Sequence, residues 1–160
     1  MWITCTGKIE FDPENKTKKH ELQSTWKRTA IVLLDKDISL YYSWFIYKRY
    51  GIALNQVLRG THFTIVNDRI NTIELTESFE SAKKMFDGTE IELSYNVDVR
   101  SDGTHWYMPA MSIDAEKIRN QIGLGDPFFN FHVTVGRADN ELNNAQSEYI
   151  LGLIRNGLIS

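Results

Sequence analysis

The sequence predicts one α+β domain built from two similar halves. Runs rich in β-branched and aromatic residues alternate with segments that begin at a capping residue and end at glycine, which indicates strands alternating with helices. The motif His-x-Thr occurs in two of the strand-like runs, at His62 and again at His132. No linker-like stretch separates the halves, so we expect residues 1–160 to form a single domain.

The first half is expected to contain three strands and two helices. The segment 38–50 is ambiguous because its aromatic residues also favour a strand, but Asp37 as a cap and Gly51 as a terminator favour a helix. In order, the expected elements are a strand at 2–11, a Lys-rich loop from Asp12 to about His20, a strand at 29–34, a helix at 38–50, a strand at 60–67 and a helix that begins at Thr76 or Ser78 and ends at Phe86.

The second half repeats this order with an added hairpin, whose turn is predicted by Ser101-Asp102-Gly103. We place the lobes at roughly 29–88 and 89–156, preceded by an N-terminal extension, residues 1–28. The expected elements are strands at 90–99 and 104–111, a helix capped by Ser112 and ended by Gly123, a motif strand after Asp126-Pro127, and a last helix that opens at Asp139 or Asn140 and carries the apolar residues Leu142, Tyr149, Ile150, Leu153 and Ile154.

The composition is that of an ordinary globular protein, 42% hydrophobic and 24% charged. The single cysteine, Cys5, excludes an internal disulfide framework. A net charge of −3 argues against binding of long nucleic acid through the overall field but is compatible with a small nucleotide. No apolar run reaches membrane-spanning length and no signal-like N-terminus is present, so we expect a cytoplasmic protein without a membrane partner.

Each His-x-Thr motif places an imidazole and a hydroxyl on one face of its strand. Side chains alternate along a strand, so His62 and Thr64 share a face, as do His132 and Thr134, while the apolar residues between them point into the core. Two such strands meeting across a cleft would supply two imidazoles and two hydroxyls. Either copy alone is more simply explained as a half-buried polar strand residue, whereas the pair favours a site for phosphate-ester chemistry.

The paired motifs, hydrophobic-His62-hydrophobic-Thr64 and hydrophobic-His132-hydrophobic-Thr134, resemble those of the 2H phosphoesterase superfamily, which includes the LigT-like RNA 2′,3′-cyclic phosphodiesterases. Arg137 matches an arginine common after the second motif in that family. The likeness covers roughly residues 29 to 156. It implies a bilobal α+β fold in which two antiparallel-rich sheets flank a central cleft with helices outside, and cleavage or transfer at phosphodiesters without a metal or other cofactor.

The compact size and the Lys-rich N-terminal stretch also resemble phage-encoded members of this superfamily. Some of those degrade the cyclic oligonucleotide signals made by bacterial anti-phage systems of the CBASS type. This narrower resemblance implies a cyclic di- or trinucleotide substrate and, for a phage-encoded protein, residence in the host cytoplasm.

A histidine pair suits such chemistry because the imidazole pKa lies near neutrality, so one ring accepts a proton while the other donates one. We assign His62 as the base and His132 as the acid, although the sequence alone does not decide between the two orders. Thr64 and Thr134 are expected to donate hydrogen bonds to non-bridging phosphate oxygens. Both threonines also suit a strand by propensity alone.

Three further residues are candidates for substrate binding. Arg137 is expected either to bind phosphate or to lie solvated at a strand end. Trp106 is our candidate for stacking on a base, and its neighbour Tyr107 could also do so, although hairpin aromatics more often pack on their neighbours. Tyr42 is a candidate for reaching the cleft from an otherwise buried aromatic helix. His105 lacks a Thr partner and is expected to be a surface residue, and the spacing of Cys and His predicts no metal site.

Several functions therefore remain open from the sequence. The first is hydrolysis of a cyclic di- or trinucleotide. The same site would also suit an RNA 2′,3′-cyclic phosphodiesterase, a 2′-5′ RNA ligase-like enzyme or an ADP-ribose cyclic phosphate hydrolase. A protein that sequesters a nucleotide without cleaving it is the alternative from a different class. The oligomeric state is not predicted.

Overall fold

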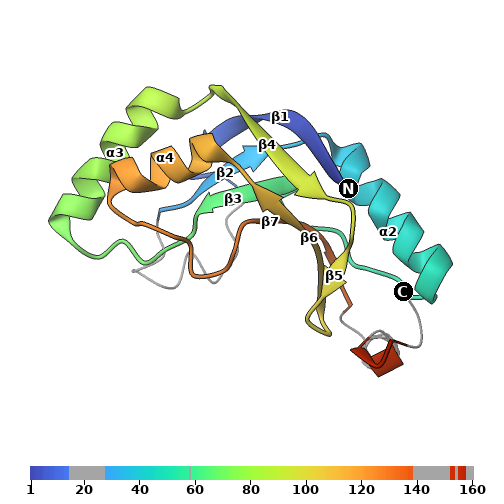
Figure 1. The fold of residues 1–160 in the computed structure, drawn as a ribbon. Coiled ribbons are helices and arrows are strands. Elements are labelled where there is room, and N and C mark those ends of the chain that lie inside the picture. The colour runs from blue at the N-terminus through green and yellow to red at the C-terminus, as the bar shows by residue number, and fades with distance from the viewer. Residues whose placement is uncertain (15–27, 58, 139–151, 154, 158–160) are drawn as a thin grey trace.

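The computed structural model describes residues 1–14, 28–57, 59–138, 152–153 and 155–157. Their main elements are seven strands and three helices, which confirms the α+β class (Figure 1). The elements are β1 (Trp2–Phe11), β2 (Ala30–Leu33), α2 (Lys36–Tyr50), β3 (His62–Val66), α3 (Ile73–Phe86), β4 (Glu90–Asn96), β5 (Arg100–Ser101), β6 (His105–Met111), α4 (Ile113–Ile122) and β7 (His132–Arg137).

The seven strands form one antiparallel sheet in the order β4-β1-β2-β3-β7-β6-β5. A further pairing of β4 with β6 closes six of these strands into a ring. The prediction of two separate sheets is therefore wrong for the described residues. The two halves of the sheet join at β3 and β7, through the pair Phe63↔Val133.

Strand β1 is an integral part of the sheet, although residues 1–28 were expected to be an extension. It pairs with β2 on one side and with β4 on the other. Strand β4 pairs with β1 from Trp2↔Asn96 to Lys8↔Glu90 and meets β6 at only two positions. The expected lobes at 29–88 and 89–156 therefore do not correspond to separate sheets, because β4 continues the sheet of the first half.

Capping explains the helix boundaries. The α2 segment is a helix and not a strand, and it ends at Gly51 as expected. Its cap is Asp35 and not Asp37, because the Asp35 carboxylate accepts a hydrogen bond from the backbone N–H of Asp37 at 2.9 Å. Helix α3 starts earlier than expected because Thr72, whose hydroxyl accepts from the Leu75 N–H, caps it.

The expected boundaries of α4 are confirmed. Ser112 accepts a hydrogen bond from the Ala115 N–H, and Gly123 ends the helix in the left-handed conformation. The expected turn at 101–103 joins β5 to β6. The strand expected at 90–99 ends at Asn96, and β5 is a separate short strand that follows it. The expected last helix lies mainly outside the described residues.

The helices lie at two ends of the sheet (Figure 1). Helices α3 and α4 lie side by side at one end, where α4 contacts β3 and β4, and α2 lies at the other end and contacts β7. Apolar side chains of the strands and helices form one buried cluster between them. Among the described residues, no helix has the length and apolar character needed to cross a bilayer.

Candidate active site

The two motif strands lie next to each other and run antiparallel. Their pairing at Phe63↔Val133 places His62 opposite Thr134 and Thr64 opposite His132, because positions in an antiparallel pair advance in opposite directions. Residues directly opposite each other have Cβ atoms roughly 4.5–5.5 Å apart, and diagonal neighbours are separated by roughly 7–8 Å. The sheet therefore brings two imidazoles and two hydroxyls together, with the imidazoles on one diagonal.

Burial alternates along both strands as the sequence predicts. Phe63 and Val133 are fully buried, whereas the four motif side chains are partly exposed. The Phe63 ring also packs on Phe131, with ring centroids 4.7 Å apart. Burying the apolar face of both strands leaves the polar groups on the opposite face, where a ligand can reach them.

Both imidazoles are held in the same way. The Nδ1 atom of His62 lies 2.7 Å from the Gly60 carbonyl oxygen, and Nδ1 of His132 lies 2.7 Å from the Asn130 carbonyl oxygen. A carbonyl oxygen only accepts hydrogen bonds, so Nδ1 carries the proton in each ring. The Nε2 atom of each neutral ring then has a free lone pair with which to accept a proton.

The surroundings of His62 favour its neutral form. Desolvation of the ring lowers the pKa of His62, and the charge of Arg59 and the nearby His132 lower it further, against an opposing contribution from the bond to Gly60. His132 affects the pKa of His62 because the pairing of β3 with β7 puts the two histidines on one diagonal of the same face. His62 is thereby suited to accept a proton near neutral pH.

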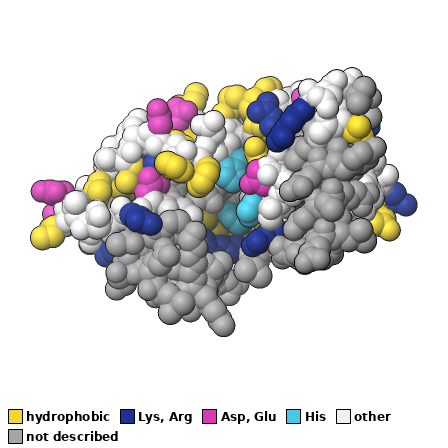
Figure 2. Space-filling view, turned by 90° about the horizontal axis from the view of Figure 1, so that it is seen from below, with side chains coloured by type: hydrophobic (Ala, Val, Ile, Leu, Met, Phe, Trp, Pro, Cys, Tyr) yellow, Lys and Arg dark blue, Asp and Glu magenta, His cyan; other side chains and the backbone are white. Residues whose placement is uncertain are grey.

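Three hollows adjoin the four motif side chains. One of about 460 Å³ borders Thr64 and His132, one of about 400 Å³ borders His132 and Thr134, and one of about 270 Å³ borders His62, Thr64 and Thr134. Figure 2 shows His side chains in a depression near the middle of this face. A larger hollow of about 550 Å³ lies along α2, and none of the four motif side chains lines it.

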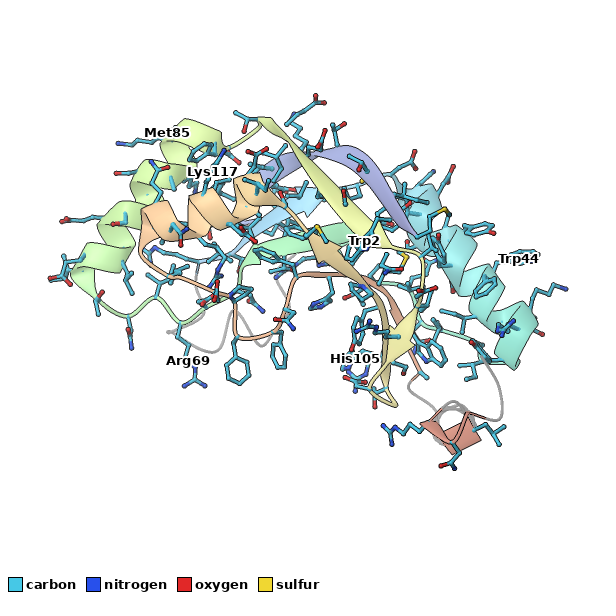
Figure 3. The ribbon with its side chains drawn as sticks, viewed as in Figure 1. Trp2, Trp44, Arg69, Met85, His105 and Lys117 are labelled. Atoms are coloured by element: carbon cyan, nitrogen blue, oxygen red, sulfur yellow. The ribbon has the colours of Figure 1, made fainter. Side chains whose placement is uncertain are left out.

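Arginines line the same three hollows. Arg59 and Arg137 border the one at His62, Arg100 borders the one at Thr134, and Arg69 borders the one at Thr64. Figure 3 shows Arg69 on the lower side of the sheet, the side on which His105 also lies. Carboxylates also line two of these hollows, Asp68 at Thr64 and Asp102 at Thr134. The described lining of the hollow at His62 has two arginines and no carboxylate, so in a protein with a net charge of −3 this hollow is locally cationic and suits an anionic ligand.

Arg137 is exposed at the end of β7 and lines the hollow at His62, and its binding of phosphate stays a prediction. Its backbone exchanges hydrogen bonds with Asn55, which holds the loop after α2 against β7. Gly136 permits this contact, since a Cβ atom there would lie 2.8 Å from the Asn55 carbonyl oxygen. The structure therefore gives Arg137 and Asn55 adjoining places in the wall of that hollow.

Two predicted binding residues do not reach the hollows. Trp106 is 1% exposed and packs against Tyr50 in the core, so its ring has no open face for a base. Tyr42 is 8% exposed and its ring packs edge-to-face on Tyr41 and Tyr95. Both expectations are wrong because these side chains point to the apolar side of their elements.

Tyr107, next to Trp106, is the aromatic residue of β6 that borders the site. It pairs with Thr134, and its ring lies 5.5 Å from that of His132 in an edge-to-face arrangement. Alternation along β6 could have indicated this, since Trp106 and Met108 are buried while Tyr107 lies on the other face. The sequence did not show which of the two adjacent residues faces the core, because tryptophan and tyrosine both suit a strand.

His105 is exposed, as expected, but it also borders the site. Its Nδ1 atom lies 3.1 Å from the Asp102 carboxylate, which accepts hydrogen bonds from the backbone N–H groups of Thr104 and His105 as well. Although desolvation opposes it, these hydrogen bonds lower the pKa of Asp102 and keep it ionised. His105 lines the hollows at Thr134 and at His62, so it lies at the edge of both.

The site has two half-sites, one around His62 and Thr64 and the other around His132 and Thr134. One buried arginine joins their ends. The Arg119 guanidinium of α4 donates two hydrogen bonds to the Asp68 carboxylate, at 2.7 and 2.9 Å. It also donates to the carbonyl oxygens of Ile65, Gly125 and Asp126. Arg119 is 1% exposed, so these bonds satisfy a charge that would otherwise be costly to bury. They fix the loop before β7 to the end of β3.

Within the described ranges, no three His, Cys, Asp or Glu side chains are grouped in a way that could hold a metal ion. Comparison with known protein families, with curated proteins and with solved structures finds no match to this chain.

Proposed function

We propose that the protein is a phosphodiesterase that cleaves small nucleotides by acid–base catalysis with His62 and His132, without a metal. The observation that carries the proposal is the antiparallel pairing at Phe63↔Val133, since it brings both motifs to one face. The matched bonds from each Nδ1 atom to a carbonyl oxygen support it further. Because Nδ1 is occupied in both rings, Nε2 is the atom that can exchange a proton with a substrate.

The reaction follows from these groups. A phosphodiester is bound with its non-bridging oxygens near Thr64 and Thr134, whose hydroxyls donate hydrogen bonds as charge develops there. Nε2 of His62 removes a proton from water or from a ribose 2′-hydroxyl, and the resulting oxygen attacks phosphorus. His132 acts in its imidazolium form, with protons on both ring nitrogens. It gives the Nε2 proton to the departing ribose oxygen and is left neutral, with Nδ1–H bonded to the Asn130 carbonyl oxygen. Each proton transfer contributes roughly 10²–10⁴-fold to the rate.

The direction of the His62 pKa shift supports its role as the base. A base must be unprotonated when the substrate arrives, and desolvation together with Arg59 favours that state. Once a proton has been taken, the imidazolium can return it in a later step, so the roles exchange if a cyclic phosphate is opened.

The surface favours a small anionic substrate over a long polymer. In its described lining the hollow at His62 has two arginines and no carboxylate, whereas the chain as a whole is acidic. Cyclic di- or trinucleotides are our first proposal. RNA 2′,3′-cyclic phosphate ends, 2′-5′ linkages and ADP-ribose cyclic phosphate present the same reacting group and form the alternative substrates.

The test is a substrate panel with product analysis. Wild-type protein is incubated, with and without chelator, with cyclic dinucleotides and trinucleotides, 2′,3′-cyclic nucleotides, 2′-5′ dinucleotides and ADP-ribose cyclic phosphate. We expect turnover of one class in both conditions, reduced roughly 10²–10⁴-fold with His62→Gln or His132→Gln. Recovery of every ligand uncut would contradict the proposal, and tight binding without cleavage would instead indicate a sequestering protein.

A further inference from the structure

The loop before β7 exposes two aromatic rings to solvent. Phe128 is 91% exposed and Phe129 is 73% exposed, and the two rings meet edge-to-face with centroids 4.9 Å apart. Phenylalanine in solvent gives up the hydrophobic stabilisation that burial would provide. A pair of exposed rings beside polar groups is typical of a binding surface.

These rings border the same space as the motifs. Phe128 and Phe129 line the hollow of about 460 Å³ together with Thr64 and His132. Phe129 also lines the neighbouring hollow of about 400 Å³, which contains Tyr107. A ligand whose phosphate lay between the motifs would therefore have an aromatic wall within reach on the His132 side.

The loop is held at both ends before any ligand binds. Arg119 binds the carbonyl oxygens of Gly125 and Asp126 just before the rings, and the Asn130 carbonyl oxygen accepts a hydrogen bond from His132 just after them. Next to Asn130, Phe131 is anchored in the core against Phe63. Such anchoring lowers the entropy lost when a ligand orders the rings.

From this arrangement we infer that Phe128 and Phe129 form a nucleobase-binding subsite, in which a planar base stacks on the rings while its phosphate lies between the motifs. The inference rests on the proposed function and specifies which part of the substrate is recognised there. Asn67, Asn130 and Arg69 line the same hollow and supply groups for hydrogen bonds to the base edge. A hollow of about 460 Å³ has the size of a small-ligand pocket. A stable protein partner would instead need roughly 800 Å² of surface on each side.

The experiment measures binding separately from turnover. Calorimetry compares 3′-AMP and 5′-AMP with ribose 5-phosphate, none of which contains a phosphodiester to be cut. We expect wild-type protein to bind at least one AMP isomer roughly tenfold more tightly than ribose 5-phosphate, in keeping with the strength of base stacking. The variant carrying Phe128→Ala and Phe129→Ala should lose this preference.

Two further variants make the result specific. Replacing Phe129 by Trp should retain the preference for AMP, because a larger ring still stacks. Trp44→Ala, which removes another half-exposed aromatic ring, on α2 (Figure 3), should leave it unchanged. Thermal melting checks that each variant is folded.

The outcomes separate this inference from the proposed function. A preference for AMP that depends on the two phenylalanines supports the subsite even if no phosphodiester of the panel is cut. Equal affinity for AMP and ribose 5-phosphate, or a preference that survives loss of both rings, overturns the subsite even if phosphodiesters are cut. A change of oligomeric state alone in the double variant would also overturn it.

Discussion

The two half-sites share a motif but differ in what surrounds it. His62 lies beside Arg59, in a hollow walled by polar residues such as Asn55 and Arg137. His132 lies beside the Tyr107 ring and the exposed rings of the loop before β7. In both halves the carbonyl oxygen two residues before the histidine holds its ring, whereas segments that do not repeat in the sequence make one half polar and the other aromatic.

This difference suggests a division of tasks within one catalytic pair. In the polar half, burial of the ring and the charge of Arg59 lower the pKa of His62, and the arginines attract phosphate. The aromatic half provides a surface for the remainder of the nucleotide. Substitutions in each half show whether the two halves are equivalent, linked or distinct.

Replacing either histidine should have the largest effect. We expect His62→Gln and His132→Gln each to reduce kcat by roughly 10²–10⁴-fold, because each removes one proton transfer. The double variant should lose less than the product of the two losses, since both groups act in one step. Steady-state rates on the best substrate of the panel measure this, and a near wild-type rate in either folded single variant would rule out the pair.

Removing the link between the half-sites should destabilise the fold. Arg119→Met leaves the partly buried Asp68 carboxylate and three carbonyl oxygens without their donor, so we expect the free energy of unfolding to fall by about 3 kcal/mol. Urea denaturation measures the change. Lys117→Met on the exposed side of the same helix is the control, expected to change stability by less than about 0.5 kcal/mol. An unchanged urea midpoint for Arg119→Met would argue against the anchoring role.

The two threonines test whether the halves are equivalent at the phosphate. Thr64→Val and Thr134→Val keep the shape of the strand and remove one donor each, so kcat should fall roughly 10²-fold in both. Thr4→Val is the matched control, because this strand threonine is exposed on β1 and bonds to Ser94. If only one of the two motif variants is impaired, the phosphate is bound by one half alone.

The smallest expected effect is on pH dependence. Since the pKa of His62 is lowered from 6.5, the acidic limb of kcat/KM should have its midpoint below pH 6.5. Arg59→Gln removes one of the charges that lower it, so the midpoint should move to higher pH by a few tenths. Folded protein binds this proton less readily than unfolded protein, so stability should also fall as the pH decreases below about 6.5. A midpoint unmoved or lowered by Arg59→Gln would contradict this assignment.

Local signals in the sequence predicted the elements whose ends depend on nearby residues. Ser112 and Gly123 bound α4 because a side-chain cap and a left-handed glycine act within one turn. The alternation of faces in the motif strands was likewise readable, since it depends only on strand geometry. These rules place the His and Thr of each motif on one face of their strand, whereas the pairing of β3 with β7 is needed to bring all four side chains together.

Pairing between distant strands was not readable from the sequence. The long contact of β4 with β1 joins residues near position 5 to residues near position 93, and no local pattern specifies that partner. The choice of Trp106 over Tyr107 failed for a related reason, because the sequence does not show which face of β6 the core covers. Arg119 was not considered because nothing near it in the sequence indicates that Asp68 and the loop before β7 surround it.

The most direct test of the central claim is whether His62 and His132 contact the same ligand. The Hε1 signals of both imidazoles are followed by NMR while the protein is titrated with hydrolysis-resistant phosphorothioate versions of the panel nucleotides. We predict that both signals shift along a single binding curve with one dissociation constant. Signals that follow different curves, or a ligand that moves only one of the two rings, would contradict a shared site.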